Sequence, residues 1–252
     1  MNMGHGRRMA KENMPVQEDI PMFRLLHLDA SARPGRSDER PHGSHTRRLS
    51  ARFVSRWRAL RPGDPVVYRD IGLAPPAPVT GDWIHAAFTP AERREPWMRE
   101  VLAQSDRLVD ELLEADLIVA GVPMYNFGVP SGFKAWIDNI VRVGRTFGFD
   151  RTRAGDPYWP LLADMGKQLV VLGSRGDHGY APGGRIEAMN HVEPSIRTAF
   201  GYIGITRMHA VAAEYDEFGG ERLTRSLADA EASVDRLVDR LAVAVATDSI
   251  AA

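Results

Sequence analysis

A short segment rich in aromatic residues and proline carries the strongest chemical signal in this sequence. It reads PMYNFGVP from Pro123 to Pro130 and directly follows the apolar run 116–122. In an open parallel sheet, ligands bind where the carboxyl ends of the strands open onto a crevice. The two prolines stiffen the loop, so it loses little entropy when a flat ring docks against it. The thioether of Met124, two aromatic rings and the amide of Asn126 predict a site that covers and hydrogen-bonds a planar cofactor.

A second candidate site lies in the polar loop between the first predicted strand and the first predicted helix. This loop offers hydroxyl groups and free backbone N–H groups at a helix start, where the helix dipole favours a phosphate. The residues concerned are Ser31, Ser44, His45 and Thr46. Ordinary capping of the helix by Ser44 or Thr46 explains the same residues equally well. The loop also contains Arg33, Arg36 and Arg40, which we interpret as a solvated basic surface.

A third loop, from Gly173 to His178, follows the fourth predicted strand and supplies backbone donors and a cation. Its candidate binding residues are Ser174, Arg175, Gly176 and Asp177. The alternative interpretation, a simple turn with a surface arginine, is stronger here than it is for the aromatic segment. His178 and His45 could donate protons, but histidines in polar loops more often form hydrogen bonds or face solvent. We therefore assign no catalytic residue.

The elements that must position these loops are predicted from apolar periodicity. The expected strands are 23–29, 64–70, 116–122, 167–174 and 206–213. The first expected helix begins at Thr46. The other expected helices cover 97–114, 131–143, 193–202 and 221–245. The segment 72–90 is rich in Pro, Gly and Ala and is predicted to be an ordered excursion rather than a linker.

This alternation of strands and helices indicates an α/β protein with parallel strands and right-handed crossovers. Five strands predict a flavodoxin-like, doubly wound parallel sheet of order 2-1-3-4-5 with helices on both faces. In that order the loops after strands one, three and four stand side by side. A Rossmann domain would need Gly-x-Gly-x-x-Gly after the first strand, which this sequence lacks.

Composition narrows the functional classes. The 252 residues are 44% hydrophobic, which predicts one domain over 22–247, with a disordered leader at 1–21 and a tail at 248–252. A net charge of −1 argues against nucleic-acid binding. The absence of cysteine excludes disulfides and thiolate nucleophiles, so redox chemistry would need a cofactor.

Further motifs point away from other classes. No window approaches about 18 consecutive apolar residues, and the start lacks the apolar core of a signal peptide, so we expect a cytoplasmic protein that does not bind membranes. No His/Asp/Glu cluster has the spacing of a metal site, and Ser174 lacks the Gly-x-Ser-x-Gly context of a hydrolase.

Several short strings together carry a resemblance over about residues 23–245. They are Ser44-His45-Thr46, Pro123-Met124-Tyr125-Asn126-Phe127, Arg142-Val143-Gly144-Arg145-Thr146-Phe147, Ser174-Arg175-Gly176 and Phe200-Gly201-Tyr202-Ile203-Gly204-Ile205-Thr206. With these strings the sequence resembles the FMN-dependent NADH:quinone oxidoreductases, also called azoreductases, of the flavodoxin-like superfamily. It departs from their usual pattern in a longer, more basic loop over 31–44 and in Asp177, where a second glycine is common.

The resemblance implies noncovalent FMN. By this resemblance, the phosphate and ribityl side of FMN would contact Ser31 and residues 44–46. The flavin ring would contact residues 124–127, and the pyrimidine edge of that ring would lie near residues 174–177. The implied cofactor-binding residues are Ser31, Ser44, His45, Thr46, Pro123, Met124, Tyr125, Asn126, Phe127, Ser174, Arg175, Gly176 and Asp177. It also implies a homodimer with active sites at the interface, and a substrate pocket that includes Phe147, Phe149 and His178.

The predicted activity follows from such a cofactor, because a flavin can take a hydride from NADH or NADPH and pass two electrons to a quinone or an azo compound. We expect ping-pong turnover through one shared cavity. Two alternatives remain, a flavodoxin-like electron carrier and a flavin-binding regulatory protein that does not oxidise NAD(P)H. Carriers are usually shorter and strongly acidic, so the near-neutral charge and the excursions at 72–90 and 144–166 speak against the first.

Overall fold

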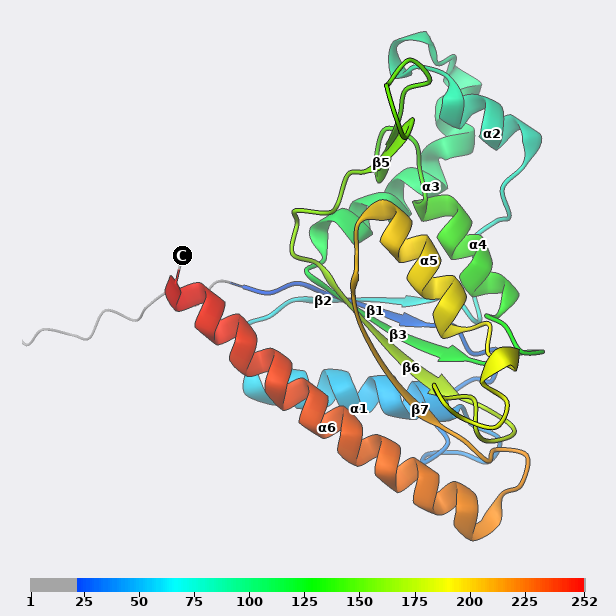
Figure 1. Cartoon of the computed structure of the whole chain (residues 1–252), viewed down its shortest axis with the longest axis vertical. Helices are drawn as coiled ribbons and strands as arrows, with labels where there is room; N and C mark the ends of the chain where they lie inside the picture. Colours follow the sequence, from blue (N-terminus) through cyan, green and yellow to red (C-terminus); the bar gives the residue numbers. More distant parts are fainter. Residues whose placement is uncertain (1–21, 252) are drawn as a thin grey trace, which may run out of the picture.

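A five-stranded parallel sheet forms the centre of the protein (Figure 1). The computed structural model describes residues 22–251, so the leader predicted at 1–21 lies outside the described residues. The sheet has the order β2-β1-β3-β6-β7, which is the predicted order 2-1-3-4-5 once only its own strands are counted. Its strands are β1 (Leu25–Asp29), β2 (Val66–Asp70), β3 (Leu117–Pro123), β6 (Gln168–Ser174) and β7 (Arg207–Ala213).

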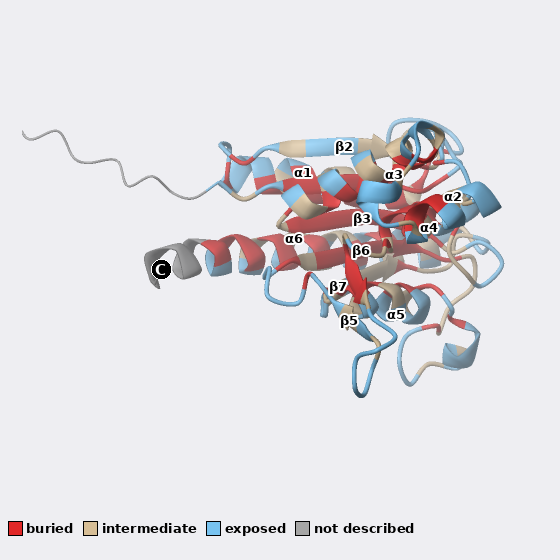
Figure 2. Ribbon diagram, turned by 90° about the horizontal axis from the view of Figure 1, so that it is seen from above, coloured by how far each residue is buried: buried red, intermediate tan, exposed pale blue. Residues whose placement is uncertain are grey.

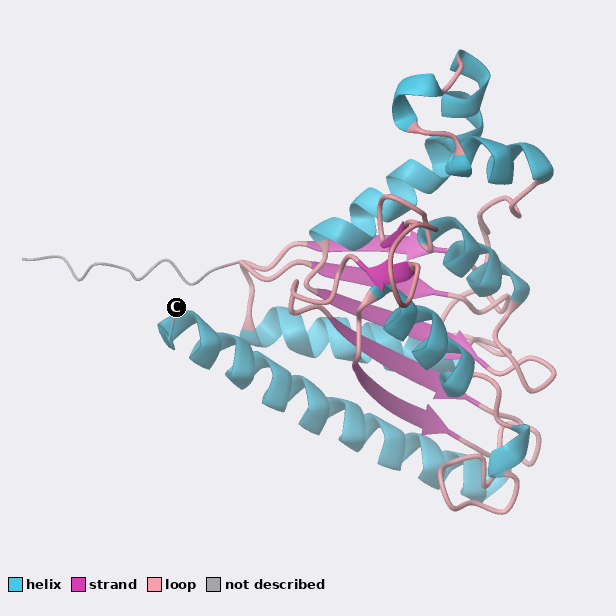
Figure 3. Ribbon diagram, turned by 45° about the horizontal axis from the view of Figure 1, so that its top comes forward, coloured by secondary structure: helices cyan, strands magenta, loops and turns pink. Residues whose placement is uncertain are grey.

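Six α-helices accompany the sheet in the described residues. They are α1 (His45–Leu60), α2 (Gly81–Phe88), α3 (Pro96–Glu114), α4 (Ser131–Ile140), α5 (Glu193–Ile203) and α6 (Gly220–Ala251). Helices α1 and α6 lie on one side of the sheet, and α3, α4 and α5 lie on the other (Figures 1 and 3). In the described part of the chain, no helix is both long and apolar enough to span a bilayer.

The central strands are mostly apolar because both faces of the sheet are covered. All seven residues of β3 are buried, and β6 is buried after its first residue. Successive side chains point to opposite faces, so two separate cores form. One core gathers Ile118 with Trp136 and Phe200, and the other gathers Val119 with Trp57. Figure 2 shows this buried layer within the sheet and along the inner sides of the helices.

Element boundaries differ modestly from the predictions. Helix α1 begins one residue early, at His45, and Ser44 is its N-cap, since its side chain accepts a hydrogen bond from the Arg47 amide. Helix α4 ends at Ile140 rather than 143, because the Thr146 hydroxyl accepts from the Arg142 amide and donates to the Ile140 carbonyl. Helix α6 continues to Ala251, so the tail predicted from 248 is helical over 248–251.

The two segments that the sequence analysis describes as excursions contain short elements. The excursion 72–90 includes α2, which packs with the start of α3 in a small core of Ala86, Ala87, Met98 and Leu102. The segment 144–166 contains the antiparallel pair β4 (Phe147–Phe149) and β5 (Tyr158–Pro160). Strands of three residues are too short to show an alternating pattern, which is why the sequence did not reveal them.

Candidate functional site

A cavity of about 400 Å³ lies at the carboxyl ends of β1, β3 and β6, the edge toward which the strand arrows point in Figure 1. This volume falls within the range of small-molecule sites in proteins. Its lining residues are Ser31, Arg33, Ser44, Pro123, Met124, Tyr125, Asn126, Ser174, Gly176, Asp216 and Glu217. The three loops singled out in the sequence therefore meet at one cavity, as the strand order predicts.

The start of α1 forms the polar end of this cavity. The Ser44 hydroxyl lies 3.0 Å from the Thr46 hydroxyl, and both side chains are buried. The Ser31 hydroxyl accepts a hydrogen bond of 3.2 Å from the Arg33 amide. First-turn N–H groups of a helix have no acceptor within the helix, and the helix dipole makes this end positive. The arrangement is suited to an anion such as a phosphate.

A buried arginine, Arg47, holds the β1–α1 loop in place. Its guanidinium donates to the Ser31 carbonyl at 2.8 Å and to the Arg33 carbonyl at 2.9 Å. The same group forms a two-point ion pair with Asp70 at 2.7 and 2.8 Å. Burial alone would raise the pKa of Asp70, but the hydrogen bonds and charge of Arg47 hold that pKa below its usual range. Arg47 thus positions the loop that carries the hydroxyl groups.

Hydrogen bonds join the three loops to one another. The Tyr125 hydroxyl accepts from the Ala32 amide at 3.1 Å, which links the first loop to the second. The Met124 amide donates to the Ser174 carbonyl at 2.9 Å, which links the second loop to the third. The cavity walls therefore support one another, although the loops lie far apart in the sequence.

The aromatic segment turns tightly at Tyr125 to Gly128. These two residues exchange backbone hydrogen bonds of 3.0 and 3.1 Å. Between them, Asn126 and Phe127 have positive φ angles of 47° and 70°. This is the conformation of a type I′ turn, which usually carries Asn followed by Gly. Asn126 fits that preference, whereas Phe127 is strained and 43% exposed.

We expect Phe127→Gly to be more stable than Phe127→Ala by about 1 kcal/mol. Glycine adopts a positive φ without the Cβ penalty, while alanine keeps it, and both substitutions remove the same exposed ring. Urea unfolding of the two variants measures the difference. An alanine variant as stable as the glycine variant would contradict the strain.

The structure brings only part of the third loop to the cavity. Ser174 and Gly176 line it, but the Arg175 side chain is 6% exposed and forms ion pairs with Glu193 and Glu214, away from the cavity. The carboxylate of Asp177 accepts from Arg185, whose hydrogen bond is the main reason that the pKa of Asp177 is lowered.

Other predicted residues also lie beside the cavity rather than on its wall. Thr46 acts through its contact with Ser44. The His45 ring lies 2.8 Å from the Ser37 hydroxyl and 3.2 Å from Asp216. The Phe127 carbonyl accepts from the His191 amide.

The three residues expected in a substrate pocket do not line this cavity. Phe147 is buried and packs against Tyr202, with ring centroids 5.1 Å apart. Phe149 stacks on Tyr158 at 4.9 Å. His178 stacks on the ring of Tyr215, which follows β7, at 4.5 Å.

Three lining residues escaped the sequence reasoning, namely Arg33, Asp216 and Glu217. Asp216 accepts a hydrogen bond of 3.2 Å from Arg33 and lies 3.2 Å from the His45 ring nitrogen. The His45 hydrogen bond, with the nearby Arg33 charge, holds the pKa of Asp216 below its usual range. Both acids lie in the loop after β7, whose carboxyl end opens at the same edge as that of β6. That shared edge is the signal that could have found them.

Glu217 also lies very close to Gly176 of the third loop. A Cβ at Gly176 would collide with the Glu217 carboxylate. A larger residue at position 176 would therefore require the Glu217 side chain to move.

The donor set of this cavity fits a phosphorylated planar group. One end offers hydroxyl groups and a helix start, and the other offers a thioether, an aromatic ring and an amide. The carboxylates of Asp216 and Glu217 oppose a phosphate, but Asp216 is balanced by Arg33. The residues present are compatible with FMN.

Comparison with known proteins adds to this geometry. A family profile described as "Flavodoxin-like fold" matches residues 24–238. The chain is 40% identical over 229 residues to the FMN-dependent NADH:quinone oxidoreductase 2 of Idiomarina loihiensis, covering 91% of this chain and 94% of the relative. It is 45% identical over 211 residues to the FMN-dependent NAD(P)H:quinone oxidoreductase 1 of Pseudomonas aeruginosa, covering 83% and 95%.

Solved structures show the same fold. The FMN-dependent NADH-azoreductase from Bacillus anthracis str. Ames Ancestor, in complex with FMN, superposes with a TM-score of 0.75. The match covers 88% of this chain and 100% of that chain, at 19% sequence identity. At this identity, the likeness concerns the fold.

Proposed function

Because this chain belongs to the family of FMN-dependent NADH:quinone oxidoreductases, within the flavodoxin-like fold, we propose that it carries two electrons from NADH or NADPH to quinones and azo compounds. The observation that carries the proposal is the cavity that the start of α1 and the Met124–Asn126 segment line together. Bound FMN would supply the hydride chemistry.

In this proposal, the residues of the cavity bind FMN and hold it in a fixed orientation. Ser31, Ser44 and the first turn of α1 hold the phosphate end, with Thr46 behind Ser44. Met124, Tyr125 and Asn126 cover and hydrogen-bond the ring, and the walls formed by Pro123, Ser174 and Gly176 exclude water from it. His45, Phe127, Arg175 and Asp177 support these walls, through backbone groups or neighbouring side chains. No side chain needs to act as a nucleophile.

The finer features are part of the same proposal. Ping-pong turnover is supported by the cavity at the carboxyl ends of β1, β3 and β6, because NAD(P)⁺ must leave this shared space before a quinone enters it. The separation of the two cores supports the doubly wound arrangement and one domain over 22–247. We also propose a cytoplasmic location, which agrees with the lack of cysteine.

A homodimer completes the proposed site. The neighbouring exposed rings of Tyr125 and Phe127 at the cavity support it, because adjacent apolar side chains form a patch of the kind that marks an interaction surface. Phe147, Phe149 and His178 would contribute to a substrate pocket only through a second subunit, since none of them lines this chain's own cavity. Sedimentation equilibrium of the protein with FMN tests the dimer, and a monomer at micromolar concentration would remove it.

A visible spectrum tests the function. We expect the full chain mixed with FMN to be yellow after gel filtration, to bleach with NADH or NADPH without oxygen, and to recover its colour with a quinone. A yellow protein that NAD(P)H does not bleach would be an electron carrier. A protein that stays colourless after FMN addition would be neither an FMN-dependent oxidoreductase nor an FMN-binding electron carrier. This result would favour a binding protein that uses no flavin.

We expect Asp216→Asn to bind FMN about fivefold more tightly at pH 7. The substitution removes a carboxylate near the phosphate end. Because Arg33 balances most of that charge, we expect a repulsion of only about 1 kcal/mol, as for two charges about 4 Å apart in bulk water. Fluorescence titration of FMN measures the change. Asp239→Asn is the matched control, because its carboxylate pairs with Arg56 of α1 and does not line the cavity, so it should leave the affinity unchanged.

Asp216 should also make the free energy of unfolding depend on pH, with a sign that follows from the direction of its pKa shift. The pKa of Asp216 lies below its ordinary value of 3.8, so its ion pairs stabilise the fold at neutral pH and are lost as pH falls through that lowered pKa. Wild type and Asp216→Asn should therefore converge in stability only below about pH 4. If Asp216→Asn binds FMN more weakly than wild type at pH 7, the carboxylate of Asp216 does not oppose the phosphate of FMN.

A further inference from the structure

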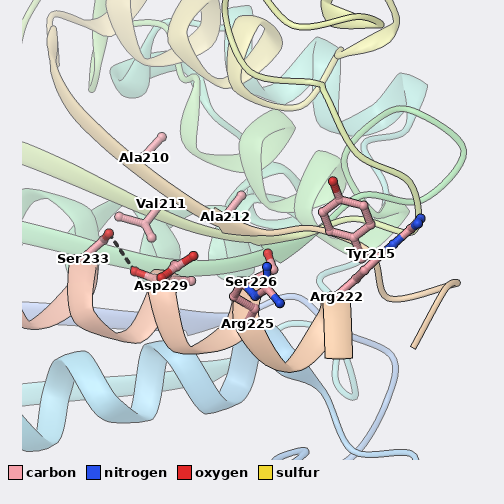
Figure 4. A pocket seen from close by; sticks show the side chains of 10 residues that line it. Ala210, Val211, Ala212, Tyr215, Arg222, Arg225, Ser226, Asp229 and Ser233 are labelled. Carbon is pink, nitrogen blue, oxygen red and sulfur yellow. Dashed lines mark hydrogen bonds between the residues drawn. The ribbon is translucent and has the colours of Figure 1, made fainter. Parts of the chain in front are cut away.

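The free edge of β7 lies in a furrow between α5 and α6. Three cavities of about 590, 420 and 310 Å³ follow this strand. The largest is lined by Ala210 and Ala212 of β7 and by one side of α6 (Figure 4). The second shares both alanines and opens toward Glu193 and Arg197 of α5. An unpaired strand is thus flanked by a helix on each side, away from the cofactor cavity.

Backbone contacts show which groups of β7 point outward. The Ala213 carbonyl accepts from the Arg175 amide beyond β6, at 3.0 Å. The next residue points the other way, because the Glu214 amide donates to the Ser226 hydroxyl of α6 at 2.8 Å. Since the direction alternates along a strand, the N–H and C=O groups of residues 208, 210 and 212 face the furrow. Within residues 22–251 no hydrogen bond to those groups is seen beyond the sheet.

These outward groups are accessible. Ala210 is exposed and Ala212 is half-buried, and the small side chain of alanine covers little of a strand edge. Such an open edge is a template for another strand. The furrow offers main-chain partners, which is the requirement for recognition by strand addition.

The charge on α6 indicates what kind of strand fits. Toward α1 this helix is acidic, and Glu231, Asp235 and Asp239 each bind an arginine of α1 at 2.7 Å. Toward the furrow it is basic, with arginines at positions 222, 225, 236 and 240 and one acid, Asp229.

Most of these furrow arginines lack an acidic partner. Arg225 pairs with Glu221, whereas Arg222 lies over the Phe218 ring and Arg236 donates to Ser233. Among the described ion pairs, none includes Arg222, Arg236 or Arg240, nor Arg197 across the furrow. The second cavity also contains Glu193 and Glu214, which pair with Arg175, and Glu187, which accepts from the Gly183 amide. The arginines of α6 and Arg197 therefore remain available to carboxylates.

We propose that the β7 edge docks an extended acidic segment of another protein, which adds to the sheet as a sixth strand. Every second residue of such a segment faces the same way, at a spacing of about 6.6 Å. Arginines four residues apart on a helix, as at 236 and 240, are spaced by about 6 Å. The two spacings match, so alternate carboxylates reach successive arginines. A second copy of this chain fits poorly, because pairing β7 with β7 brings the two sets of arginines together.

A labelled peptide tests the proposal on the full chain. The probe is a fluorescein-labelled octapeptide of alternating Thr and Glu, compared with one of alternating Thr and Lys, by fluorescence anisotropy. We expect only the Glu peptide to bind, more weakly at high salt. Ala210→Pro should weaken binding at least tenfold, because proline removes the outward N–H yet is tolerated on an edge strand. The control Ala210→Ser keeps that N–H and should bind like wild type.

A second variant separates charge from backbone. Arg236→Gln with Arg240→Gln should weaken binding at least threefold and reduce its salt dependence. If circular dichroism shows that Ala210→Pro does not fold, hydrogen exchange of the Ala210 and Ala212 amides in wild type decides, since the peptide should slow it. Equal binding by the proline and serine variants, equal binding of the Lys peptide, or no binding to wild type would overturn the proposal. A sedimenting mass that drops in Ala210→Pro without peptide binding would assign the edge to a second copy, and would overturn it too.

Discussion

Arg47→Met should lower the free energy of unfolding by about 3–5 kcal/mol and abolish measurable FMN binding. The guanidinium is buried and lies 3.6 Å from Asp29 as well as 2.7 Å from Asp70. Methionine fills much of the same volume but leaves both carboxylates without their cation. Removing one partner of a buried ion pair is costly because the remaining charge has neither water nor a counter-ion. The Ser31 and Arg33 carbonyls lose their donor at the same time.

Chemical unfolding in urea measures this loss, and flavin fluorescence measures the binding. Arg52→Met is the matched control, because Arg52 lies on the same helix and pairs with Asp235 at 2.7 Å in an exposed position. Exposed ion pairs contribute about 0.2–1 kcal/mol, so this variant should stay near wild type and keep FMN. Equal losses in the two variants would show that Arg47 has no special role in the loop.

Arg47 also illustrates what the sequence could not reveal. The notable feature of this residue is its burial, and its partners Asp29 and Asp70 come from two different strands. Nothing in the local pattern of α1 distinguishes it from Arg48, which pairs with Glu231 at the helix surface. Only the assembled sheet determines which arginine faces inward. A buried charge is therefore visible in sequence only after its partners have been placed.

The sheet itself could be predicted for a simple reason. Both faces of β3 and β6 are covered, so their sequences are apolar without interruption, and such runs are recognisable. The strand order then places the loops after β1, β3 and β6 at one edge, and the structure confirms that they meet there. The hydrogen bond between Tyr125 and the Ala32 amide is the detailed result of that general rule.

Side-chain direction within those loops was less predictable. Arg175 sits in the right loop, but Glu193 and Glu214 turn its side chain away from the cavity. Those acids lie on α5 and after β7, so their effect depends on how later elements pack. Asp216 was missed for a related reason. It lies in the loop after β7, and the sequence analysis did not place that loop at the cavity. Topology locates a site, whereas tertiary partners decide which side chains enter it.

The phosphate end of the site gives the sharpest functional test. Ser44→Asp should weaken FMN binding at least a hundredfold while leaving the fold intact. Aspartate caps a helix as well as serine does, and its charge suits the positive end of α1. The same carboxylate would lie on the cavity wall beside the proposed phosphate. Repulsion between charges about 4 Å apart is of order 4 kcal/mol near a protein surface, more than the roughly 2.8 kcal/mol that a hundredfold change requires.

Ser44→Asn separates charge from capping, because asparagine also caps helices well but is neutral. This variant should keep FMN affinity within about threefold of wild type, a difference below 1 kcal/mol. Thermal unfolding of both variants without FMN should match wild type within a few degrees, which shows that α1 is intact. If Ser44→Asp retains FMN, the phosphate does not lie at the start of α1. If Ser44→Asn loses it as fully as Ser44→Asp, the serine hydroxyl rather than the absence of negative charge is what the phosphate needs there.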